Sequence, residues 1–107
     1  MSEDSQILIP ASFIALFVPP GRQRPSASHA HIAGRYELCE DLAQMLVETA
    51  RTMLFALSIT EDLVLARVQQ GLLADPASVD AAEAAWVTRR LAELLDWAPL
   101  PGVARED

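Results

Sequence analysis

The sequence predicts an all-α fold: a small bundle of about three helices, long, short and long, preceded by an apolar N-terminal arm. Between Ile32 and Leu57, apolar residues recur at alternating spacings of four and three, which places them on one face of a helix. Ala and Leu, both strong helix formers, dominate the chain, while aromatic residues make up only 6% of it. Outside the arm, no segment has the pattern of a β-strand.

The first helix, expected to begin near residues 29–32 with Ser28 as N-cap, carries two parallel rows of residues. The main row consists of Ile32, Tyr36, Cys39, Ala43, Leu46, Ala50, Met53 and Leu57. The second row consists of Leu38, Leu42, Met45 and Ala56, with Thr49 and Thr52 filling its gaps. Together they make a stripe wider than the seam of a two-stranded coiled coil. Other helices, from the same chain or from a second copy, are therefore expected to cover it.

Residues 58–62 mark the end of the first helix and the start of a second. Thr60 is the predicted N-cap, and acidic residues favoured by the helix dipole follow it. Ile59 and Val64 have the spacing of a hydrophobic staple. Gly71 is the predicted C-terminal residue, which gives a short helix of about ten residues.

The third helix has two possible starting points. Asp75 can cap it with Pro76 in the first helical position, or Asp80 can cap it with Glu83 completing a capping box. The helix is expected to end near residue 96, and residues 98–107 form a predicted flexible tail. Residues 29–97 therefore make up the predicted helical domain.

Residues 1–28 comprise an acidic tip, an apolar arm over 7–18 and a linker rich in Pro, Gly and Arg. The arm fits either a short helix from about Ala11 to Phe17 or an extended segment. An isolated strand needs a pairing partner, in the same dimer or in a client protein. The helix is the favoured alternative, and in both cases something must cover the apolar surface.

The composition argues against several classes of partner and activity. The net charge of −7 disfavours nucleic acid and anionic membranes. The apolar run of residues 7–18 is too short to span a bilayer and follows acidic residues, so neither a transmembrane helix nor a signal peptide is predicted. Cys39 is the only cysteine, so no intramolecular disulfide can form, and a cytoplasmic location is expected.

The chain contains no lysine, because all eight of its basic residues are arginine. A P-loop needs a lysine to neutralise nucleotide phosphates, and Schiff-base chemistry needs an amine. A Walker-type ATPase is therefore excluded.

Two groups of polar residues are candidate sites. His29 and His31 could hold a metal with nearby carboxylates, but ligands two residues apart diverge at a helix start, which favours two exposed polar residues. An acidic side of the first helix fits a solvated face or a strip for docking a partner, and comprises Glu37, Glu40, Asp41 and Glu48. Arg89 and Arg90 are expected to point outward, spaced to pair with Glu93. No metal and no cofactor is predicted.

Two stretches resemble a group of small, uncharacterised proteins of high-GC proteobacteria. The first runs from Ile9-Pro10-Ala11-Ser12-Phe13 through Val18-Pro19-Pro20-Gly21-Arg22 to Arg35-Tyr36-Glu37-Leu38-Cys39-Glu40-Asp41, and the second is Arg90-Leu91-Ala92-Glu93-Leu94-Leu95 before Trp97. Some of these proteins are called "ATPase with chaperone activity". The resemblance implies a chaperone-like role, and it brings no catalytic motif.

The sequence thus favours a non-enzymatic protein-interaction module, cytoplasmic and homodimeric. Such a module would be an adaptor, a regulatory subunit or a chaperone-like binder of a client protein. The predicted contact residues are Phe13, Leu16 and Phe17 in the arm, together with Trp97. The alternative is a small metal- or ligand-binding helical enzyme that uses His29, His31 and acidic residues of the first helix.

Overall fold

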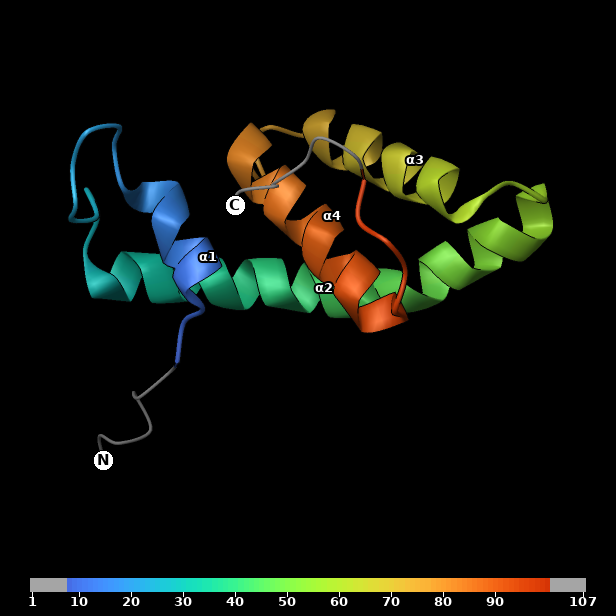
Figure 1. Ribbon diagram of the computed structural model, residues 1–107, viewed down its shortest axis with the longest axis horizontal. Helices are drawn as coiled ribbons and strands as arrows, with labels where there is room; N and C mark the ends of the chain where they lie inside the picture. The colour runs from blue at the N-terminus through green and yellow to red at the C-terminus, as the bar shows by residue number, and fades with distance from the viewer. Residues whose placement is uncertain (1–7, 101–107) are drawn as a thin grey trace. The chain divides into compact units, whose positions relative to one another are not determined.

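The computed structural model describes residues 8–100 and is helical in that range, without β-strands (Figure 1). Its elements are α1 (Ala11–Ile14), the 3-10 turn η2 (Ala15–Phe17), α2 (His29–Leu57), α3 (Glu61–Leu73) and α4 (Ala81–Leu95). The predicted all-α class is confirmed for these residues. The chain divides into two units, Met1–Leu38 and Cys39–Asp107, with the boundary inside α2.

In the N-terminal unit, α1 and η2 together cover Ala11–Phe17, so the arm adopts the predicted short helix and not the extended alternative. The helix starts after Pro10, whose carbonyl accepts hydrogen bonds from the N–H groups of Phe13 and Ile14 at 3.0 and 3.1 Å. Proline suits this position because its fixed φ is compatible with a helix start and an N–H is not needed there. The three-helix prediction is therefore incomplete, because the arm adds a fourth, short helix.

The aromatic ring of Phe13 is fully buried in this unit. Its centroid lies 5.6 Å from the ring of Phe17 and 5.6 Å from that of Tyr36. The linker folds back on the arm, because the N–H and hydroxyl of Ser26 both donate to the Phe17 carbonyl, at 2.7 and 3.1 Å. The arm, the linker and the first turns of α2 thus form a small cluster around one aromatic side chain.

The linker reverses direction through a turn at Pro19–Arg22. The N–H of Arg22 donates to the Pro19 carbonyl at 3.0 Å, and Gly21 has a φ of 78°. Proline in the second position and a glycine with positive φ in the third are the residues that a type II turn requires. At the end of the linker Ser28 caps α2 as predicted, because its Oγ accepts the His31 N–H at 3.1 Å.

The core of the C-terminal unit brings together side chains from α2, α3 and α4; Figure 1 shows the course of these helices. Its fully packed members are Ala50, Val64, Leu65, Val68, Leu91, Ala92 and Leu95. Ile59 packs against this cluster, to which Val64 belongs, in agreement with the predicted staple. Ala50 is the buried α2 residue of this cluster.

Helix α3 begins after Thr60, as predicted, but it ends later than predicted. Thr60 occupies the N-cap position, but its hydroxyl donates to the Asp62 carboxylate at 2.5 Å and does not cap a backbone N–H. The helix continues past Gly71 to Leu73, so the predicted end is wrong. Leu72 packs against the core cluster, and this burial offsets the cost of about 1 kcal/mol for glycine inside a helix.

Helix α4 begins at the later of its two predicted starts. The Glu83 N–H donates to the Asp80 side chain at 2.8 Å, and the Asp80 N–H donates to the Glu83 carboxylate at 3.0 Å, which completes the capping box. Asp75 lies instead in a turn, where its carboxylate accepts the Ser78 hydroxyl at 2.6 Å. Because of the later start, α4 has 15 residues and is only slightly longer than α3, which has 13. Of the two helices predicted to be long, only α2 is much longer than α3.

Candidate functional site

The two rows of residues on α2 have different environments. Cys39, Ala43 and Ala50 of the main row are completely buried. In the second row, 68% of Met45 is accessible to solvent, and Thr49 and Thr52 are also exposed. The described residues therefore cover most of the main row, although Leu57 at its end is 46% exposed, and they leave this part of the second row without a cover.

Phe55 adds a large aromatic side chain to the exposed side of α2, with 80% of its surface accessible. We call this surface the outer face of α2 and define it as Met45, Glu48, Thr49, Arg51, Thr52, Phe55 and Ala56, all of them exposed. Phe55 was missed by the sequence analysis because it falls outside both rows. The signal that could have found it is a phenylalanine that follows the polar Arg51 and Thr52 by about one turn of the helix.

Glu48 and Arg51 supply the charges of the outer face. Their side chains form an ion pair of 3.4 Å one turn apart, and they are 83% and 54% exposed, respectively. Exposed pairs of this kind contribute less than about 1 kcal/mol to stability. Breaking this ion pair, so that Glu48 or Arg51 can bind another charged group, therefore costs little free energy.

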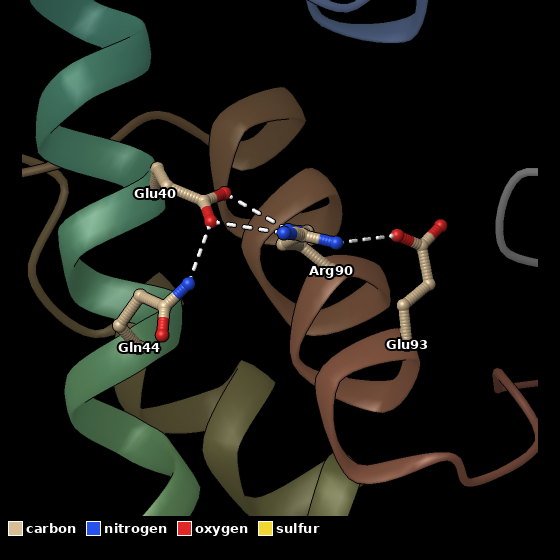
Figure 2. A network of polar contacts seen from close by, with 4 residues as sticks. All are labelled: Glu40, Gln44, Arg90 and Glu93. Carbon is tan, nitrogen blue, oxygen red and sulfur yellow. Dashed lines mark hydrogen bonds and ion pairs between the residues drawn. The ribbon is translucent and has the colours of Figure 1, made fainter.

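A polar network joins α2 to α4 within the C-terminal unit (Figure 2). The Arg90 guanidinium donates to both carboxylate oxygens of Glu40, from Nε at 2.9 Å and from Nη2 at 3.0 Å. Gln44 donates to the same carboxylate at 2.8 Å, and Arg90 also reaches Glu93 at 3.1 Å. The predicted Arg90–Glu93 pair is confirmed, but Arg90 does not point freely outward, and Glu40 is not part of a solvated acidic face.

The network shifts the pKa values of Glu40 and Arg90. The hydrogen bond from Arg90 lowers the pKa of Glu40 below its ordinary value, although partial burial opposes the shift. The hydrogen bond to Glu40 likewise raises the pKa of Arg90. Both groups are charged at neutral pH, so Glu40 is not a proton donor there. The network is a bridge that holds two helices together.

The two histidines lie at the start of α2. Both histidines are exposed, and the rings of His31 and Phe17 form a T-shaped pair with their centroids 5.9 Å apart. Over residues 8–100, no group of three or more His, Cys, Asp or Glu side chains is placed to hold a metal ion.

The four predicted contact residues are all at least partly covered. Phe13 is fully buried, whereas Leu16 and Phe17 are half-buried within the N-terminal unit. Trp97, also half-buried, packs against the core cluster of the C-terminal unit. None of the four offers as much apolar surface as Met45 or Phe55.

An open recess of about 530 Å³ lies where α3 begins in the C-terminal unit. It is lined by Leu54, Thr60, Glu61, Asp62, Ala98 and Pro99. Two of its polar side chains, Thr60 and Asp62, are already bonded to each other. The recess therefore lacks the convergent polar groups by which a pocket orients a small ligand.

Neither a family model, nor a curated protein, nor a solved structure matches this chain. Within the described part of the sequence, no helix is both long enough and apolar enough to cross a bilayer. The outer face of α2 is thus the strongest candidate site, and its geometry favours contact with another macromolecule.

Proposed function

We propose that the protein is a non-enzymatic protein-interaction module that is homodimeric and docks through the outer face of α2. It would serve as an adaptor, a regulatory subunit or a chaperone-like binder of a client. The observation that carries the proposal is the exposure of Met45 and Phe55, at 68% and 80%, on a helix whose opposite side is packed.

The energetics of these side chains favour a covered state. Burying a phenylalanine or methionine side chain contributes about 1.5–3 kcal/mol relative to leaving it in water. Aromatic residues and methionine are also enriched in protein interfaces, where methionine adapts to the shape of the partner. A helix that presents both within about three turns supports a role in binding protein.

The N-terminal arm is a second proposed contact. The sequence predicts contacts with a partner at Phe13, Leu16, Phe17 and Trp97. Of the arm residues, Leu16 and Phe17 keep part of their surface exposed. The buried ring of Phe13 would support such a contact indirectly, by holding Phe17 in place.

Light scattering on the full chain and three variants tests which surface associates. We expect the wild-type chain to have twice the monomer mass of 11.7 kDa and Phe55→Glu to be monomeric and folded. Leu73→Glu, at an exposed apolar position on α3, is the matched control and should keep the dimer. Phe17→Ala tests the arm. A dimer that survives Phe55→Glu but not Phe17→Ala would move the contact from α2 to the arm.

A further inference from the structure

We propose that the outer face of α2 docks antiparallel onto the same face of a second copy, with a two-fold axis near residue 50. The inference rests on the proposed function and adds the orientation and register of the contact. It is carried by the self-complementary order of apolar, small and charged residues along the face.

The residues concerned share one side of the helix. At about 100° per residue, Met45, Glu48, Thr52 and Phe55 fall within an arc of about 80°, and Arg51 lies at the edge next to Phe55. All of them are exposed, so a second helix can reach them without rearrangement of the core.

The large and small side chains are arranged symmetrically along this face. Met45 and Phe55 are equally far from residue 50, so a two-fold axis there brings Met45 against Phe55 of the partner subunit. Contacts between a thioether and an aromatic ring are favourable. Between these two large side chains, near the level of the axis, lie the smaller Thr49 and Thr52 together with the charged Glu48 and Arg51.

The charges follow the same symmetry. The midpoint between Glu48 and Arg51 lies half a residue from the midpoint between Met45 and Phe55. This offset is about 0.8 Å along the helix axis. An antiparallel dimer therefore places Glu48 beside Arg51 of the partner subunit, and the symmetry repeats this pair. A parallel dimer would instead place Glu48 beside Glu48 of the partner subunit, which is repulsive. Exposed pairs of this kind select orientation more than they add affinity.

Charge reversal with sedimentation equilibrium tests this register. Glu48→Arg and Arg51→Glu should each raise the dimer Kd about tenfold, because two attractive pairs become repulsive. An equimolar mixture of the two variants should form a heterodimer with near wild-type Kd, since one chain then carries both positive charges and the other both negative ones. The double variant should also recover the wild-type Kd.

Two features separate this result from a general effect of charge. Glu48→Arg changes the net charge from −7 to −5, so general repulsion between chains would fall and the Kd would decrease, opposite to the expected result. Arg67→Glu, at an exposed position on α3, changes the net charge as Arg51→Glu does and should leave the Kd unchanged. Thermal unfolding of each variant measures any loss of folding stability that results from breaking the Glu48–Arg51 ion pair within one chain.

The outcomes distinguish the inference from the proposed function. If Phe55→Glu abolishes the dimer while both charge reversals leave its Kd unchanged, the inferred register is wrong and the proposed contact surface stands. If wild-type chain stays monomeric, or if neither Phe55→Glu nor the charge reversals affect the dimer, the proposed function fails together with the inference.

Discussion

At the scale of single residues, the contact between Glu40 and Arg90 is the best-defined polar feature. The two residues are 50 positions apart in the sequence, yet they share a two-pronged hydrogen bond with both side chains largely shielded from solvent. Charge-assisted bonds of this geometry are among the stronger polar contacts in proteins. We therefore expect the pair to contribute to the packing of α4 against α2.

Replacement of Glu40 by glutamine should lower the free energy of unfolding by about 1–2 kcal/mol at pH 7, because Arg90 loses its carboxylate partner while keeping Glu93. Urea denaturation measures the change. Glu37→Gln, at an exposed position one turn earlier on α2, is the matched control and should change stability by less than about 0.5 kcal/mol. Equal losses in both variants would contradict a specific contribution from the Glu40–Arg90 pair.

The same pair predicts a pH dependence. Because the folded-state pKa of Glu40 is lowered, its contribution is complete above the ordinary glutamate pKa and is lost as the pH falls through the lowered value. The stability difference between wild type and Glu40→Gln should therefore be constant near neutral pH and shrink below about pH 4.3. Denaturation at a series of pH values measures it, and a difference that persists unchanged into acid would refute the assignment.

At the scale of the elements, local patterns predicted much of the fold. The spacing of apolar residues between Ile32 and Leu57 and the Ser28 cap identified α2, and the Asp80–Glu83 box is one of two predicted starts for α4. These signals lie within a few residues of the feature that they predict. The Glu40–Arg90 contact could not be found in this way, because only the packing of α4 on α2 brings the two residues together.

Gly71 shows why the end of α3 was misplaced. A glycine near the end of an apolar pattern is a common C-terminal signal, but here the contact of Leu72 with the core extends the helix past it. Phe55 was missed for a different reason, because it falls outside both rows of residues that the spacing picks out on α2.

The replacement Gly71→Ala should raise the free energy of unfolding by about 0.5–1 kcal/mol. Gly71 lies inside a helix, and an added Cβ would meet no atom within 4 Å apart from its chain neighbours and the backbone of its own helix, so alanine adds helix propensity without a clash. Thermal or urea denaturation measures the gain. A loss of stability would show that α3 ends at Gly71, as the local signal alone suggested.

At the scale of the whole molecule, the described residues leave the outer face of α2 exposed, with the large apolar side chains of Met45 and Phe55 on it. An acidic surface with a net charge of −7 opposes non-specific association of the chains. A specific contact at the outer face of α2 therefore has to overcome this repulsion, which favours a dimer that dissociates on dilution.

The most direct measurement is the solution mass of the wild-type chain over a wide range of concentrations, by light scattering. We expect the mass to rise from 11.7 kDa to twice that value as the concentration increases, and to remain at 11.7 kDa for Phe55→Glu at every concentration. A wild-type chain that is monomeric throughout would contradict the account, as would a dimer that is insensitive to the change at Phe55.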